Sequence, residues 1–190
     1  RPAGSRPRRR TQRARPRDHH LRAGQETQLA PQDGLAAGDL FGHSVSLSSS
    51  GERIAIGAPN HNINEGIVRV YDWVGGSWVK QGQDINGTTG DGLGGSVTLS
   101  SSGAKLAIGA MAANSSTGYV KIYDWNGNSW VQLGENINGE SIPSAFGASV
   151  SLSDDTNILV VGGNANSGAG SVNGYVQVYF YSFMFVGFFF

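Results

Sequence analysis

The sequence predicts an all-β protein made of propeller-type blades, each with four antiparallel strands. Three observations support this fold class. Glycine accounts for 29 of the 190 residues, about twice its usual share of about 7%. One pattern of residues returns at a constant offset of 52, and its apolar segments are short, alternate with a period of two and are bounded by Gly, Asn or Ser. Short strands between tight turns are typical of propellers.

Each copy of the repeat begins with an alternating segment that predicts the first strand, a. In the first copy Val45 and Leu47 alternate with Ser44 and Ser46, so one face of the strand is apolar and the other is small and polar. The three versions of this segment are 41–48, 93–100 and 146–153.

The next segment, b, is apolar at nearly every position, as expected for a strand that is covered on both faces. It comprises residues 54–58, 106–110 and 159–163. Strand c follows at 66–73, 118–125 and 174–179, and strand d at 77–80 and 129–132. Ser-rich and Gly-rich links of a few residues connect a to b and c to d, which predicts tight hairpins.

The repeat is complete twice and stops within its third copy, which predicts an incomplete ring with two open blade faces. Propeller rings need about four to eight blades. We divide the chain into a basic disordered tail (1–28), the blades (29–179) and a hydrophobic C-terminal tail (180–190). The chain begins with Arg rather than Met, which we interpret as a fragment or a processed product.

The net charge of zero conceals two oppositely charged regions. Residues 1–22 hold nine Arg and one Asp, whereas the remainder holds five basic and thirteen acidic residues. The basic tail has no aromatic or base-reading residues beside it, so we expect no nucleic-acid partner. The apolar C-terminal run is shorter than the about 20 residues that span a bilayer, so we expect no membrane span and an end that is prone to aggregation.

At these segments the chain resembles the FG-GAP family of repeats, which occur in integrin α-chains and in surface proteins of bacteria and marine algae. The resemblance covers roughly residues 29–179 and includes the Phe41-Gly42 and Gly57-Ala58-Pro59 motifs. It implies a β-propeller that serves as a non-enzymatic binding or adhesion module, extracellular or at the cell surface. Members of integrin type carry an Asp-rich calcium loop between strands a and b.

This chain has Ser-rich links at 48–51 and 100–103 in place of that loop. Calcium needs about six to eight oxygen ligands, several of them carboxylates, so we expect no calcium, no other metal and no cofactor. No Ser-His-Asp set, His-rich metal spacing or phosphate-binding Gly loop is present, and we predict that the chain is not an enzyme. The alternative is an accessory or degenerate domain of a carbohydrate-active, sialidase-like enzyme, because the Asp72 to Trp78 hairpin is similar to the Asp-box of sialidases.

The loops between strands b and c differ most among the copies, which fits either recognition of a protein or glycan ligand there or tolerated drift in exposed loops. Together with the d to a loops they form one side of a propeller, here called the loop face. The candidate ligand-binding residues are Asn60, His61, Asn62, Asn64 and Asn114. Two Asn-x-Ser/Thr sequons, at Asn86 and Asn114, are candidate glycosylation sites if the chain is secreted.

Overall fold

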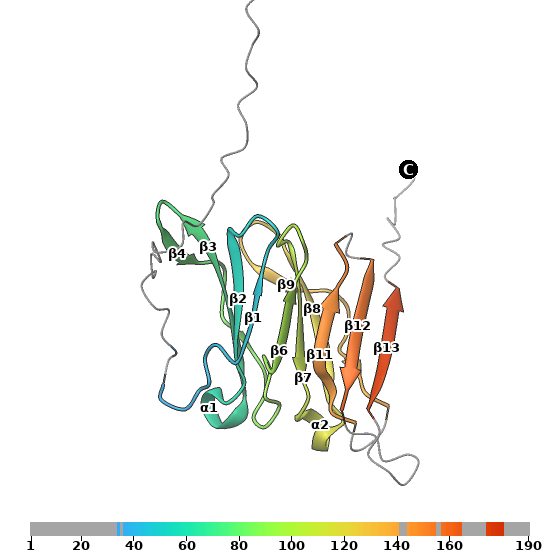
Figure 1. The fold of residues 1–190 in the computed structure, drawn as a ribbon. Coiled ribbons are helices and arrows are strands. Elements are labelled where there is room, and N and C mark those ends of the chain that lie inside the picture. Colours follow the sequence, from blue (N-terminus) through green and yellow to red (C-terminus); the bar gives the residue numbers. More distant parts are fainter. Residues whose placement is uncertain (1–33, 35, 141–143, 155–156, 165–173, 181–190) are drawn as a thin grey trace, which may run out of the picture. The chain divides into compact units, whose positions relative to one another are not determined.

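The structure, a computed structural model, describes residues 34, 36–140, 144–154, 157–164 and 174–180. These residues form three antiparallel sheets that lie side by side in chain order (Figure 1). Each sheet corresponds to one copy of the repeat, so the predicted propeller-type blades are confirmed, and the described sheets do not close into a ring. Both predicted tails lie outside the described residues, except that Phe180 is the last residue of a strand.

Blade 1 has the strand order β1-β2-β3-β4, and a fifth strand, β5, also pairs with β3. Gly75 and Gly76 join β3 to β4 with φ of 61° and 93°. Two consecutive positive φ angles give the tight hairpin turn whose twist matches the flanking strands. The elements are β1 (Ser44–Leu47), β2 (Arg53–Ala58), α1 (His61–Asn64), β3 (Ile67–Val74), β4 (Ser77–Lys80) and β5 (Ile85–Asn86).

Blade 2 repeats this topology with the same register. Ser44 pairs with Gly57 in blade 1, and Ser96 pairs with Gly109 in blade 2. Its elements are β6 (Ser96–Leu99), β7 (Lys105–Ala110), α2 (Ala113–Ser116), β8 (Tyr119–Trp125), β9 (Trp130–Gln132) and β10 (Ile137–Asn138). The described part of blade 3 has three strands, β11 (Phe146–Leu152), β12 (Ile158–Gly163) and β13 (Tyr175–Phe180).

The outer strand of each complete blade is interrupted, which we did not predict. β4 pairs with one end of β3 through Tyr71 to Val74, and β5 pairs with the other end through Ile67 and Val68. Residues 81–84 bulge between the two pieces. An Ile-Asn-Gly sequence recurs at 85–87 and 137–139, so the repeat itself held the signal for β5 and β10.

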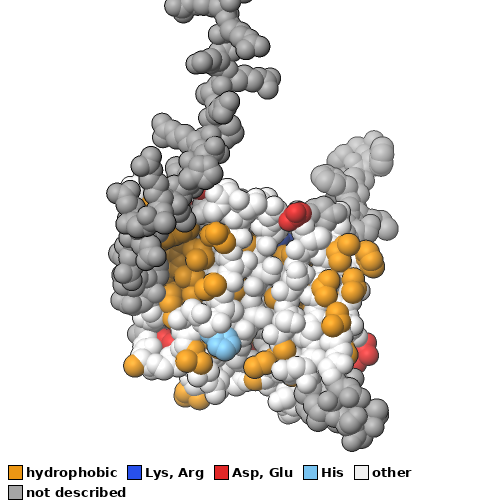
Figure 2. All heavy atoms as spheres, viewed as in Figure 1, with side chains coloured by type: hydrophobic (Ala, Val, Ile, Leu, Met, Phe, Trp, Pro, Cys, Tyr) orange, Lys and Arg blue, Asp and Glu red, His pale blue; other side chains and the backbone are white. Residues whose placement is uncertain are grey.

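Apolar side chains of strands a and c form the core between neighbouring blades. Val97 and Leu99 of β6 are buried in one cluster with Val68 and Val70 of β3, and a second cluster joins β8 to blade 3. The residues of blade 1 that are equivalent to Val97 and Leu99 are Val45 and Leu47, which are 61% and 58% exposed because none of the described residues packs over them as a preceding blade. Figure 2 shows exposed hydrophobic side chains gathered at the opposite, β13 end.

Polar contacts repeat at both junctions between blades. The Ser44 hydroxyl donates to the Gly94 carbonyl at 2.7 Å, and the Ser96 hydroxyl donates to the Gly147 carbonyl at the same distance. A Cβ atom at Gly57 would lie 2.2 Å from the Gly94 oxygen. The glycines of the two family motifs therefore meet across the junction, where no side chain fits.

Candidate functional site

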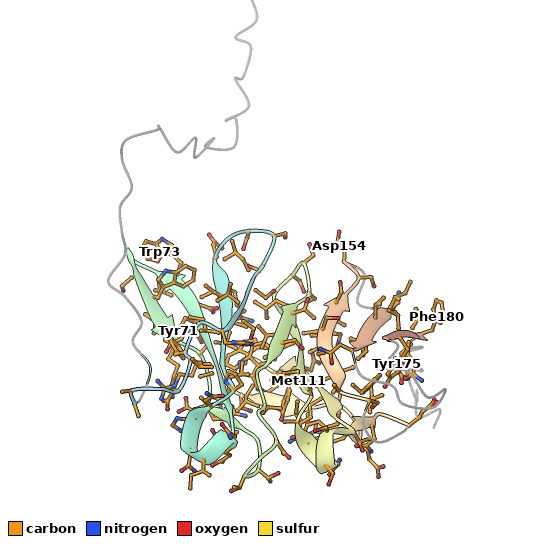
Figure 3. All side chains as sticks on the ribbon, turned by 60° about the horizontal axis from the view of Figure 1, so that its bottom comes forward. Tyr71, Trp73, Met111, Asp154, Tyr175 and Phe180 are labelled. Atoms are coloured by element: carbon orange, nitrogen blue, oxygen red, sulfur yellow. The ribbon has the colours of Figure 1, made fainter. Side chains whose placement is uncertain are left out.

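The b to c loops of blades 1 and 2 lie at the same end of the sheets. Figure 1 shows α1 and α2 at the lower end, opposite the hairpin that links β1 to β2, and Figure 3 turns that end forward. The predicted loop face is therefore one side of the described fold. The d to a segment that includes Gly90 and Gly92 also contributes to a pocket there.

The backbone of these loops is left-handed at three consecutive positions. In α1 the φ angles of Asn62, Ile63 and Asn64 are 48°, 58° and 59°. Asn adopts this conformation more readily than most residues, whereas a β-branched residue rarely does. Ile63 is also 79% exposed, so this loop exposes an apolar residue whose backbone conformation is strained. The equivalent positions in α2 are Asn114, Ser115 and Ser116.

A pocket of about 260 Å³ opens between the first b to c loop and blade 2. Its polar side chains are those of Asn60, Asn64 and His43, and its apolar side chains come from both blades. The complete lining is Leu40, His43, Pro59, Asn60, Asn64, Gly90, Gly92, Gly95, Met111 and Ala112.

The structure brings together only some of the residues that we chose from the sequence. Asn60 and Asn64 line the pocket. His61 directs Nδ1 to the Asp39 carboxylate at 2.9 Å, and the Asn62 amide donates to the Glu65 carboxylate. Asn114 is exposed in α2 and is not part of the pocket lining.

Three further lining residues were not among those candidates. Leu40 has a φ of 59° and is 49% exposed, and Met111 is 40% exposed. His43 had no expected role because the other copies have Gly95 and Ala148 at its position. The only sequence signal for these three residues is that each differs from the residues at the same position in the other copies of the repeat. The same signal marked the b to c loops.

The buried aspartates at the entrance to blades 1 and 2 support turns. The Asp91 carboxylate accepts hydrogen bonds from the backbone N–H and hydroxyl of Thr88 and from the Tyr119 hydroxyl at 2.6 Å. Burial pushes the pKa of Asp91 upward, but these hydrogen bonds outweigh burial and hold the pKa below its ordinary value. Burial, followed by the bond to Asp91, raises the pKa of Tyr119. Asp39 similarly accepts from the Ala36 N–H.

Serine hydroxyls organise the a to b links on the opposite side of the sheets. The Ser48 hydroxyl accepts from the Arg53 N–H at 3.1 Å and lies 3.2 Å from the Ser50 hydroxyl. Ser100 makes the equivalent contacts with Lys105 and Ser102. Within the described ranges no three His, Asp or Glu side chains are grouped so that they could hold a metal ion.

Asn86, in β5, is exposed, as is Asn114, so both side chains are accessible. Neither helix in the part of the chain that the structure describes has the length and apolar character needed to cross a membrane.

Residues 23–71 match the family model for the FG-GAP repeat. No curated protein matches the chain. Among solved structures, the chain is similar to a candidate 6-phosphogluconolactonase from Bacteroides uniformis, with 13% identity and a TM-score of 0.48. The match covers 71% of this chain and 40% of that protein, so this chain spans less than half of its length. The family match in one copy and the same blade in the next support an FG-GAP-like repeat protein.

Proposed function

We propose that the chain is a non-enzymatic binding or adhesion module that recognises a protein or glycan through its loop face. The observation that carries the proposal is the pocket beside α1, where two loop asparagines meet apolar side chains. A carboxamide both donates and accepts hydrogen bonds. A small pocket with an apolar lining and a few polar groups is the usual form of a ligand site.

The pocket chemistry suits recognition of a hydroxyl-rich or amide-rich surface. Asn60 and Asn64 can hydrogen-bond to sugar hydroxyls or to a peptide backbone, while Leu40 and Met111 offer apolar contact. Ile63 adds an exposed apolar group on the same loop. Its strained conformation supports a role in binding, because strain of this kind tends to persist at ligand sites.

The family also supports a location outside the cell or at its surface. FG-GAP repeats are typical of extracellular and surface proteins, and the chain has two exposed sequon asparagines, Asn86 and Asn114. We expect both to carry glycans when the chain is expressed through a secretory pathway. A mass shift that is removed by glycosidase treatment would test this expectation.

Binding can be tested by applying the purified chain to arrays of defined glycans and of extracellular-matrix peptides. The chain should bind at least one class of probe, and Asn60→Ala with Asn64→Ala should weaken that binding about tenfold or more. Asn128→Ala is the matched control because Asn128 is an exposed asparagine in the hairpin between β8 and β9. If the Asn60→Ala, Asn64→Ala double variant bound as well as the Asn128→Ala control, the assignment to the pocket would be wrong, and hydrolysis of a bound glycan would contradict the non-enzymatic role.

A further inference from the structure

We infer that the two ends of the blade stack bind each other between copies of the chain, so that the Phe41-Gly42 edge of one copy enters a socket beside β13 of another. Two junctions between blades lie inside the chain. Each one shows what a blade face accepts from the blade that follows it.

At both junctions, an apolar residue followed by glycine inserts between two glycines of the preceding blade. Leu93 is fully buried and bridges in parallel to Gly66, while Gly94 lies against Gly57. At the second junction Phe146 is fully buried and bridges to Gly118, and Gly147 lies against Gly109. One geometry therefore accepts either Leu or Phe.

Blade 3 presents the same receiving surface without an occupant among the described residues. Its glycines equivalent to Gly57 and Gly66 are Gly162 and Gly174, which line a cavity of about 490 Å³ together with Ser149. A Cβ atom at Gly162 would meet only Ser149 of its own blade. On β13, Val176 and Val178 are 66% and 52% exposed, whereas Val120 and Ile122 at the equivalent positions of β8 are buried.

Blade 1 presents the matching insertion surface. Gly42 has a φ of 94°, close to the 91° of Gly94 and the 87° of Gly147. The space around its Cβ position is open within 4 Å, whereas Gly94 and Gly147 contact the blade before them. The edge is therefore already in the docking conformation.

Exposed apolar residues lie next to the Phe41-Gly42 edge, on strand β1. Phe41 is half-buried, and Val45 and Leu47 are exposed. Their equivalents in blade 2, Val97 and Leu99, are 8% and 6% exposed beneath blade 1. A second copy would cover Val45 and Leu47 in the same way with Val176 and Val178.

The interface joins two different surfaces, so it is head-to-tail. This arrangement leads to a test by complementation. Val45→Glu damages the insertion edge and leaves the socket intact, while Val176→Glu damages the socket and leaves the edge intact. Both positions are more than half exposed, so a glutamate stays solvated in the monomer and the fold is retained.

The experiment is sedimentation of the full chain across a range of concentrations, with circular dichroism to confirm folding. The unmodified chain should sediment as an assembly heavier than its 20.0 kDa. Each variant alone should be a folded monomer, and an equimolar mixture of the two should again form a pair. If Val176→Glu fails to fold, Val178→Glu replaces it in the same design.

Ile63→Glu is the control, because Ile63 is the more exposed apolar residue but lies on the loop face; it should associate like the unmodified chain. A chain that stays monomeric at all concentrations would overturn the inference. So would association that persists in both end variants, as expected of aggregation through the Phe-rich end, or a mixture in which no pair forms.

Discussion

The junction between blades 1 and 2 has an outer clasp that is not repeated among the described residues of the junction between blades 2 and 3. Arg53 donates to both oxygens of the Asp72 carboxylate at 2.6 and 2.7 Å and to the Gly103 carbonyl of blade 2. Its guanidinium also lies 5.2 and 5.6 Å from the ring centroids of Trp125 and Trp130. At the second junction Lys105 reaches Asp124 at 3.2 Å, and the described part of blade 3 has no equivalent tryptophan pair.

The difference separates two layers of the junction. The inner layer is present at both junctions. It consists of the glycine contacts, the serine hydrogen bonds and the apolar strand faces. The outer layer needs strand d of the second blade, because Trp130 lies in that strand, β9. Gln83, in the bulge after β4, exchanges two hydrogen bonds with the Trp130 backbone. A blade can therefore dock without the clasp, and the clasp adds stability where a fourth strand is present.

The largest effect should follow from filling the inner layer. Gly57→Ala and Gly109→Ala would place a Cβ atom 2.2 and 2.0 Å from a backbone oxygen of the next blade. Because backbone must shift, we expect each to lower the free energy of unfolding by about 3 kcal/mol, measured by urea denaturation.

Gly162→Ala is the matched control, since its Cβ atom would meet only the movable Ser149 hydroxyl. It should cost less than about 1 kcal/mol on the same scale. Equal losses at all three glycines would mean that the glycines serve the strand rather than the junction.

The outer clasp should have the next largest effect. Arg53→Ala removes charge-assisted hydrogen bonds and the contact with two rings, so we expect a loss of about 2 kcal/mol in the free energy of unfolding. Lys105→Ala should cost less, about 1 kcal/mol, because the carboxylate that it pairs with at 3.2 Å, Asp124, is 44% exposed. If the two losses were the same, the clasp would add nothing beyond an ordinary ion pair.

A pH titration should distinguish blade 1 from blade 2 more finely. Arg69 and Lys80 both donate to Asp84, whereas in blade 2 Gln132 donates to Asn136 at the equivalent place. Burial raises the pKa of Asp84, but the hydrogen bonds from Arg69 and Lys80 outweigh it and lower the pKa overall.

The folded pKa of Asp84 thus lies below its unfolded value of about 4. Its stabilising contribution is complete above that value and is lost as the pH falls through the folded pKa. Asp84→Asn should therefore flatten the dependence of thermal stability on pH between about 5 and 2. An unchanged slope would assign the acid sensitivity to another group, such as Asp91.

The smallest effect should be a gain in stability on the loop face. Ile63→Gly relieves a left-handed φ at a β-branched residue, and we expect the free energy of unfolding to rise by about 1 kcal/mol. Ser115→Gly, at the same place in α2, should change it by less. Thermal melts would reveal the difference, and destabilisation by Ile63→Gly would show that the Ile63 side chain makes a packing contribution.

Internal repetition made strands a to d predictable, because strands a, b and c could each be compared among three copies and strand d between two. The interrupted outer strand was missed because β5 and β10 have two residues each, too few for an alternating pattern. The side of the sheets that carries the variable loops was predicted from propeller topology. The pocket was only half predicted, since its lining combines Leu40 and Asn60 of blade 1 with Met111 of blade 2, a combination that no local pattern encodes.

The interruption of the outer strand has a consequence for self-association of another kind. An exposed strand edge offers unpaired backbone groups to any other extended chain. In blades 1 and 2 the bulge divides this edge into pieces of two to four residues. β13 is a straight strand of six residues whose outer edge is unpaired among the described residues. Fibril growth by strand addition would therefore begin at β13, and a proline at an outward-facing backbone N–H of that strand should suppress it.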